Sequence, residues 1–215
     1  MSVSGLFLVL FLLFHMSMNL AAVFSTEAYN AICEFLGANW YALAGTLILA
    51  AGVVVHLVYA TVLTLHNRSS RGSQRYAMTA EPEGVTWASR NMYVLGIIIV
   101  LGLLLHLYNF WYNMQFAEII GNHELGPFPP ADGAAYIAAL FSSPVYCIIY
   151  LVWFAAIWFH LTHGFWSAFH TIGWDNQTWL PRLKRIANVV ATIVFLCFAL
   201  VVIVFYPVSY THLRA

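Results

Sequence analysis

Long apolar runs separated by short polar segments dominate the pattern of this chain. A bilayer core requires about 20 apolar residues per helix, and the segments that meet this length are 4–24, 40–65, 91–113, 144–170 and 186–206. None has an Asp, Glu, Lys or Arg in its interior. Backbone groups in lipid must be hydrogen-bonded within the segment, so the pattern predicts helices and lacks the alternation of a membrane β-barrel. We expect an all-α bundle of five transmembrane helices, forming a single domain over residues 1–215.

Composition supports a membrane protein and excludes several other classes. Of the 215 residues, 62% are apolar and 7% are charged, against about 25% charged in a soluble domain. A soluble enzyme, a disordered chain and a nucleic-acid binder, which would need clustered basic residues, are therefore excluded. Cys33, Cys147 and Cys197 are far apart and form no C-x-x-C or C-x-x-C-H motif, so covalent haem attachment and thiolate metal sites are not supported.

The basic residues predict the orientation in the membrane. Two polar segments, after the second and before the fifth apolar run, contain most of them: Arg68, Arg71, Arg75, Arg90, Arg182, Lys184 and Arg185. The segments after the first and third runs contain acidic residues and no Lys or Arg: Glu27, Glu34, Glu118, Glu124 and Asp132. Because basic loops stay on the cytoplasmic side, we expect a cytoplasmic N-terminus and a multi-pass protein of the cytoplasmic (inner) membrane. Residues 114–143 are interpreted as an ordered external loop.

Nine histidines, more than the residues of either charge class, are the unusual feature of the chain. Five lie at or near helix ends or in loops. Four of these are interpreted as interfacial or solvated, namely His66, His123, His170 and His212, while His163 stays open. The other four lie deep, one in each of the first four helices: His15, His56, His106 and His160. An ionisable group within the membrane is costly without a partner and marks a functional site.

Depth sorts the four deep histidines into two pairs. At about 1.5 Å rise per residue, His56 and His160 each lie about 24 Å from the outer ends of inward-running helices. By the same rise, His106 lies about 22 Å from the inner end of its outward-running helix, and His15 lies near the middle of the first helix. The sequence predicts an inner pair, His56 with His160, and an outer pair, His15 with His106. Two imidazoles from different helices match the axial ligands of a six-coordinate haem iron.

Small residues accompany these histidines at one-turn spacing. Gly52 and Gly102 each precede a histidine by four residues, and Gly164 follows His160 by four, so each shares a helix face with it. They are interpreted as space for a flat porphyrin, although small residues also serve helix–helix packing. Asn19, four residues after His15, could serve a haem propionate or a quinone. A zinc or copper site would require three or four ligands at one depth.

With these residues in place, the chain resembles the five-helix, dihaem cytochrome b membrane anchor of succinate:quinone oxidoreductase and fumarate reductase. The resemblance covers essentially the whole chain. It rests on SGLFLVLFLLFH ending at His15, VVVHLVYA around His56, GLLLHLYNFW around His106 and HLTHGFWSAFHTIGW from His160 to Trp174. In the last segment, the family pattern is a ligand histidine, a glycine four residues later and a Gly-Trp or Gly-hydrophobic pair at the helix end. His160, Gly164 and Gly173-Trp174 match it, which favours His160 over His163 as the ligand.

The resemblance implies two haem b groups, ligated by His15 and His106 (outer) and by His56 and His160 (inner). It also implies a flavoprotein subunit and an iron–sulfur subunit as partners, and a substrate that is menaquinone or another quinone. The chain would serve respiration and the tricarboxylic acid cycle, and a dimer of complexes would be compatible with it. Dicarboxylate chemistry would take place on another chain, so no catalytic residue is assigned to this one.

The resemblance is incomplete at the proton-handling positions. Some family members have a glutamate two residues before the fourth ligand, where this chain has Trp158. An acidic residue near the outer haem accepts quinol protons in the family, and Glu34, with Glu27 second, is the candidate here. Two alternative functions remain open: a cytochrome b subunit of a hydrogenase or formate dehydrogenase, and a haem-free membrane scaffold or small transporter.

Overall fold

The computed structural model describes residues 1–71, 86–174 and 176–212, and every regular element in these ranges is helical. Five helices are long and apolar enough to cross a membrane, which confirms the predicted all-α, multi-pass architecture for the part of the chain described. In chain order the elements are α1 (Ser2–Phe24), α2 (Thr26–Ala38), α3 (Trp40–Arg71), α4 (Trp87–Arg90), α5 (Met92–His106), the π-helical turn η1 (Leu107–Trp111), α6 (Gln115–Ile120), α7 (Gly133–Phe141), α8 (Pro144–Thr171) and α9 (Trp179–His212).

The helix ends differ from the predicted spans where polar residues continue a helix beyond its apolar run. Helix α9 begins at Trp179 rather than near residue 186, because Asn176 accepts hydrogen bonds from the amides of Thr178 and Trp179 and starts the helix among basic residues. Helix α3 likewise continues past residue 65 to Arg71. Apolar length predicts the membrane-crossing part of a helix, whereas capping determines where the helix begins.

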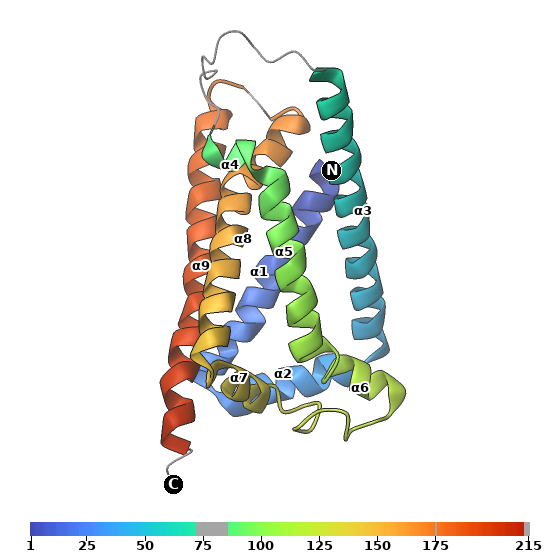
Figure 1. The fold of residues 1–215 in the computed structure, drawn as a ribbon, viewed down its shortest axis with the longest axis vertical. Coiled ribbons are helices and arrows are strands. Elements are labelled where there is room, and N and C mark those ends of the chain that lie inside the picture. Colours follow the sequence, from blue (N-terminus) through green and yellow to red (C-terminus); the bar gives the residue numbers. More distant parts are fainter. Residues whose placement is uncertain (72–85, 175, 213–215) are drawn as a thin grey trace.

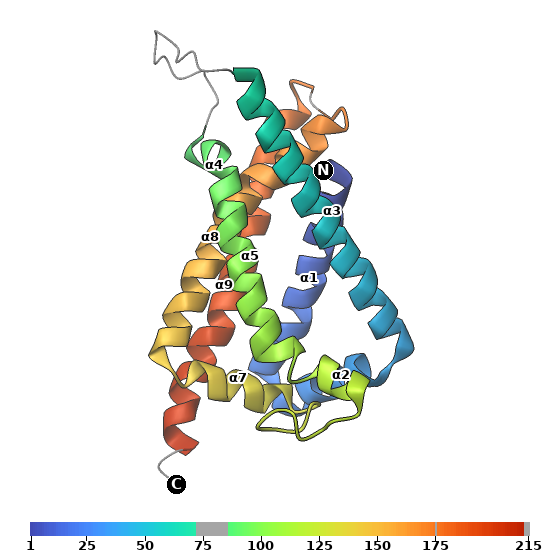
Figure 2. The same cartoon turned by 45° about the vertical axis from the view of Figure 1, so that its right-hand side comes forward.

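The two predicted external segments fold into short helices that lie across one end of the bundle, α2 in the first and α6 and α7 in the second (Figures 1 and 2). Side-chain caps begin two of them. Ser25 accepts from the amide of Ala28 at the start of α2, and Asp132 accepts from the amide of Ala135 at the start of α7. We call this layer the outer cap. Half of the expected ordered external loop, residues 114–143, is thus helical.

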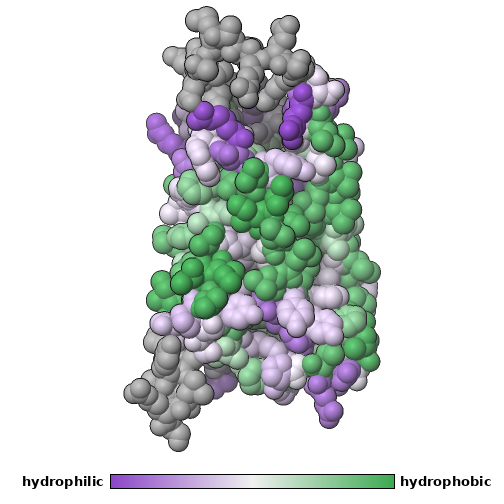
Figure 3. All heavy atoms as spheres, viewed as in Figure 1, coloured by the Kyte–Doolittle hydropathy of each residue, from purple (hydrophilic) through white to green (hydrophobic). Residues whose placement is uncertain are grey.

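The opposite end of the bundle holds the N-terminus together with the helix ends nearest the basic residues, those of α3, α4 and α9 (Figure 1). We call it the basic end. Arg68, Arg90 and Arg182 lie in these elements, whereas Arg75 lies outside the described residues. The space-filling view shows hydrophilic residues towards both ends and a hydrophobic band between them (Figure 3). Which end faces the cytoplasm stays a prediction of the charge pattern.

The bundle packs tightly on one side and loosely on the other. Helix α8 runs along α9, and α1 and α5 pack against this pair. Their contact surface contains the most deeply buried side chains, among them Val194 and Val202, each 2% exposed. Helix α3 packs mainly against α1, and none of its most apolar window is buried. The views in Figures 1 and 2 show α3 leaning away from α8 and α9.

The turn η1 continues α5 directly after His106 and closes with the amide of Tyr112 bonded to the carbonyl of Leu107, five residues back. Such an insertion of one residue into a helix shifts everything that follows on the helix surface. Asn109, within the turn, donates to the hydroxyl of Tyr150 on α8 at 3.2 Å. The turn therefore ties the end of α5 to α8 just beyond the histidine.

The outer cap is joined internally by Asn30. Its Nδ2 donates to Oδ1 of Asp132 at 2.8 Å, and its Oδ1 accepts from the amide of Ala134 at 2.9 Å, which links α2 to the start of α7. Beside this link, a methyl group on Gly133 would lie 2.5 Å from the sulfur of Cys33. Burial raises the pKa of the Cys33 thiol to about 11. These helices are therefore in close, dry contact.

Replacing Asn30 with alanine should loosen the outer cap. The variant loses both hydrogen bonds and leaves the amide of the buried Ala134 without its acceptor, so we expect a loss of about 1–3 kcal/mol in the free energy of unfolding, measured by denaturant titration in detergent micelles. Asn122→Ala is the matched control, since Asn122 is exposed and its side chain accepts from the amide of Glu124, two residues further on. Equal stability of the two variants would contradict the assigned role.

Candidate functional site

A cavity of about 1620 Å³ lies between α1, α3, α5 and α8, on the loosely packed side of the bundle. Pockets for a single small molecule usually measure about 300–1,000 Å³, so this cavity has room for more than one ligand. Its walls are mostly apolar, and all four deep histidines line it: His15, His56, His106 and His160.

The structure brings the rings of His15 and His106 together. Their centroids are 5.7 Å apart, and the ring planes are nearly perpendicular at 89°. Aromatic rings surround the pair: Phe11 stacks on His15 at 5.4 Å, and Trp153 lies 5.6 Å from His106. His15 lies on α1 and His106 at the end of α5, so this pair joins two helices across the cavity.

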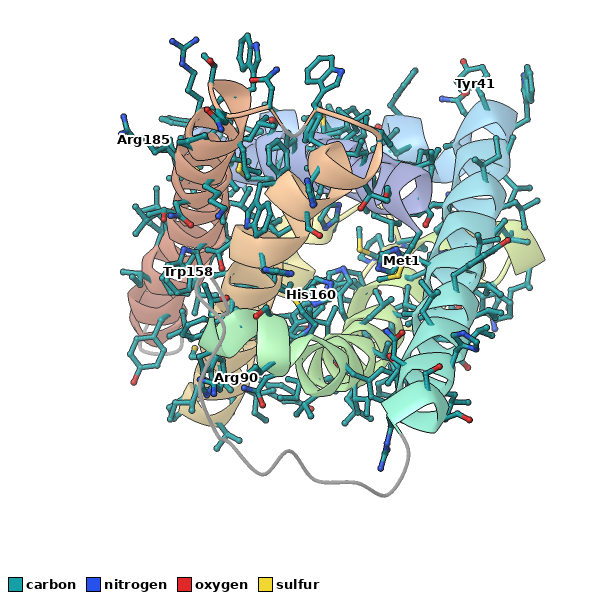
Figure 4. The ribbon with its side chains drawn as sticks, turned by 90° about the horizontal axis from the view of Figure 1, so that it is seen from above. Met1, Tyr41, Arg90, Trp158, His160 and Arg185 are labelled. Carbon is teal, nitrogen blue, oxygen red and sulfur yellow. The ribbon has the colours of Figure 1, made fainter. Side chains whose placement is uncertain are left out.

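A second pair lies closer to the basic end. The rings of His56 on α3 and His160 on α8 have centroids 6.4 Å apart at an interplanar angle of 66°. Viewed along the bundle, His160 lies in the space between the helices, whereas Trp158 lies on the side of α9 (Figure 4). Trp158 donates to the hydroxyl of Thr192 on α9 at 3.0 Å, so it serves helix packing away from the cavity. These are the same two pairs that the depth of the histidines predicts.

The separation within each pair suits a metal ion between two imidazoles. With metal–nitrogen bonds of about 2.0–2.1 Å, as for zinc, and about 1.1 Å from nitrogen to ring centre, opposite ligands have centroids about 6.3 Å apart. The observed values of 5.7 Å and 6.4 Å lie on either side of that distance. Within the described ranges, no group of three or more His, Cys, Asp or Glu side chains is arranged to hold a metal ion. Each pair supplies two imidazoles, the number of protein ligands that a haem iron takes, whereas a tetrahedral zinc site takes three or four.

Among the described residues, three histidines at the cavity have an unpaired ring nitrogen. The Nδ1 atoms of His106, His160 and His163 are buried and have no hydrogen-bond partner within the described part of the chain. Buried polar groups are normally bonded, and those that are not call for a functional explanation. His163 also lines the cavity. Its ring contacts Trp166 edge-on at 5.0 Å, whereas the histidine ring that contacts His56 is that of His160.

The three predicted haem-packing glycines have different surroundings. A methyl group on Gly164 would contact only Met92 and His160, at 3.7 Å or more. At Gly52 it would lie 2.7 Å from the ring of Phe7, and at Gly102 it would overlap the indole of Trp153. In the structure as it stands, aromatic side chains from the neighbouring helices take the space beside Gly52 and Gly102, as in helix packing.

The two quinone candidates differ in their position relative to the cavity. Asn19 lines it, but both ends of its amide are bonded: Oδ1 accepts from Tyr29 at 3.2 Å, and Nδ2 donates to the carbonyl of His15 at 2.8 Å and approaches Nε2 of His15 at 3.3 Å. Glu34 is exposed on α2 and is not among the residues that line the cavity, and Glu27 is exposed beside the N-cap Ser25.

A polar group at the outer-cap end of the cavity is not predicted by the sequence. Gln115 accepts from Thr46 at 2.8 Å and from the indole of Trp111 at 2.9 Å, and it joins α3 to η1 and α6. Glu118, one turn further on, also lines the cavity and lies 3.6 Å from Nδ1 of the exposed His123. Thr46 and Gln115 are 69 residues apart in the chain, so the sequence shows that each is polar but not that they bond each other.

Comparison with family models, with curated proteins and with solved structures finds no match to this chain. The description of the site therefore rests on its own geometry.

Gly102→Ala tests the packing beside His106. The added methyl group overlaps Trp153, whose Nε1 donates to the carbonyl of Ile99 at 3.0 Å, so the indole must move. Overpacking of this kind costs about 1–3 kcal/mol, measured as a lower free energy of unfolding in micelles.

The control for this variant is Gly96→Ala on the same helix, where a methyl group meets nothing within 4 Å. Alanine favours helix over glycine by about 1 kcal/mol, so this variant should be as stable as the native chain or more so. A Gly102→Ala chain as stable as Gly96→Ala would show that Trp153 is not held against α5.

Proposed function

We propose that this chain is the haem-carrying membrane anchor of a succinate dehydrogenase or fumarate reductase. In this function it relays electrons between an iron–sulfur subunit and a quinone pool. The observation that carries the proposal is the presence of two histidine pairs from four helices in one cavity, at 5.7 Å and 6.4 Å. The resemblance of the sequence to the dihaem anchors adds the identity of the complex, which the geometry alone does not supply.

The four histidines would hold two haem irons. His56 and His160 would hold the iron nearer the basic end, and His15 and His106 would hold the iron nearer the outer cap. A bis-histidine haem supplies reversible one-electron transfer with no open position for oxygen. The chain contributes fixed ligands on rigid helices and an apolar wall that excludes water, while phenylalanine, tyrosine and tryptophan rings pack around His106.

The ends of the bundle would have different tasks. The basic end faces the cytoplasm, following the positive-inside rule, and receives the iron–sulfur and flavoprotein subunits. Quinone chemistry takes place towards the outer cap. There the polar group of Gln115, Thr46 and Glu118 lies at the cavity, whereas Glu34 lies outside it. Protons would reach this end from the external side, since no span contains a carboxylate in its apolar interior.

Two alternatives remain to be separated from this proposal. A cytochrome b subunit of a hydrogenase or formate dehydrogenase would use the same histidines with different partner chains. A haem-free scaffold or small transporter would leave the pairing of four histidines without a purpose.

Haem content tests the first part of the proposal. The native chain, produced with sufficient haem, should contain two haem b groups, quantified from reduced pyridine haemochrome spectra. His56→Gln and His106→Gln should each lose one of the two, because each removes one ligand of one pair. His66→Gln is the control, since His66 is exposed near the end of α3 and should retain both. A colourless native chain would exclude the dihaem function and leave the scaffold.

Electron donors test the identity of the complex. In native membranes that contain the chain with its partners, succinate should reduce the haems, and a dicarboxylate-site inhibitor should prevent this. The haem-reduction spectrum is the readout. Reduction by hydrogen or formate, with none by succinate, would favour the alternative complexes.

A further inference from the structure

We propose that Ser4 is a positioning residue for His56, which fixes the proton of His56 on Nδ1 and leaves Nε2 free as the metal-binding nitrogen. The hydrogen bond itself is a property of the chain without cofactor. Its effect on haem affinity and potential rests on the proposed function.

The hydroxyl of Ser4 takes part in two hydrogen bonds, one with Met1 and one with His56. The hydroxyl of Ser4 donates to the carbonyl of Met1 at 2.9 Å, and the same oxygen lies 3.3 Å from Nδ1 of His56. A hydroxyl has one proton and two acceptor positions. We assign that proton to the shorter contact, to Met1, and the oxygen then accepts from His56. In this assignment the Nδ1 atom carries a hydrogen, and in a neutral imidazole Nε2 is unprotonated.

The neighbouring residue brings the imidazole close to α1. A methyl group on Gly5 would lie 3.5 Å from Cε1 of His56, so the ring lies against the backbone of α1 at this point. Ser4 and Gly5 thus form the contact surface on α1 for His56 of α3, the membrane-spanning helix that packs most loosely in the bundle. The same His56 ring has its centroid 6.4 Å from that of His160.

The four histidines differ in this respect. Nδ1 of His106 and Nδ1 of His160 have no partner within the described residues, whereas Nδ1 of His56 has Ser4. A hydrogen-bond acceptor on the second nitrogen of a ligating histidine fixes its tautomer and orientation and makes it a more basic ligand. A more basic ligand stabilises the oxidised iron, so Ser4 lowers the potential of the inner haem relative to a site without it.

A simpler explanation of Ser4 is that its hydroxyl satisfies only its own helix. Serines in helices commonly bond a carbonyl of the preceding turn, and Ser17 does so, donating to Leu13 at 2.8 Å. Ser17 thus provides a matched control on the same helix. Ser17→Ala removes a hydroxyl that donates to a backbone carbonyl, whereas Ser4→Ala also removes the acceptor for His56.

The first experiment measures the tautomer of His56 in the chain without haem. The ¹⁵N spectrum of the histidine-labelled full chain in micelles distinguishes a protonated from an unprotonated ring nitrogen, and the His56 signals are those that disappear in His56→Gln. We expect Nδ1–H in the native chain and in Ser17→Ala and Ser4→Thr, with a reduced Nδ1–H population in Ser4→Ala. Nε2–H in the native chain, or no difference between Ser4→Ala and Ser17→Ala, would overturn the proposal.

The second experiment uses the haem-loaded complex in a redox titration followed by its optical spectrum. Ser4→Ala should raise the potential of one haem, leave the other unchanged and weaken haem retention at one site by about 10-fold, with Ser4→Thr restoring the native values. Unchanged potentials would overturn the tuning role. A chain that binds no haem would refute the proposed function and this tuning role together, while the ¹⁵N spectrum would still decide whether Ser4 bonds His56.

Discussion

The organisation of this protein depends on the cost of placing imidazoles in an apolar membrane interior. A polar side chain without a partner is expensive there, and this chain has one deep histidine on each of four helices. The structure brings the rings together across helices in two pairs at two depths, and within the described residues the Nδ1 atoms of His106 and His160 stay without a hydrogen-bond partner. Those contacts occur in the cavity, where the bundle is otherwise loosely packed. The residues that are costly for the fold therefore line the cavity that we propose as the functional site.

The tight and loose sides of the bundle have complementary tasks. Helices α8 and α9 with α1 provide the packed core, which holds His15 and His160 in fixed positions. Helix α3 contributes His56 from the other side of the cavity with little buried surface of its own. The contact of His56 with Ser4 and Gly5 is therefore one of the points at which α3 is held against α1 beside the cavity. The outer cap lies across the end of the bundle that is opposite the basic end, and Asn30 links its helices α2 and α7.

Much of this organisation is predictable from the sequence, because membrane length and histidine depth are both one-dimensional properties. Apolar runs predict the five spans, and a constant rise per residue pairs His15 with His106 and His56 with His160. Local rules fail where distant residues meet. Nothing in the chain indicates that Thr46 and Gln115 bond each other, or that Phe7 and Trp153 lie beside Gly52 and Gly102. The short cap helices depend on Ser25 and Asp132, whose capping role is clear only once the helices exist.

The π-helical turn η1, directly after His106, sets the direction in which the residues at the end of α5 point. An α-helix advances about 100° per residue, and η1 accommodates one residue more than a regular turn would. Asn109 in η1 donates a hydrogen bond to Tyr150 just beyond the histidine. Gln115, at the start of α6, accepts a hydrogen bond from Thr46 on α3. Deleting a single residue within Leu107–Trp111 would restore a regular turn and rotate the residues directly after η1 by about 100° about the axis of α5. The chain then turns at residues 112–114 into α6, so the extra residue in η1 helps to set the direction in which the chain leaves His106 for the polar group at the outer cap.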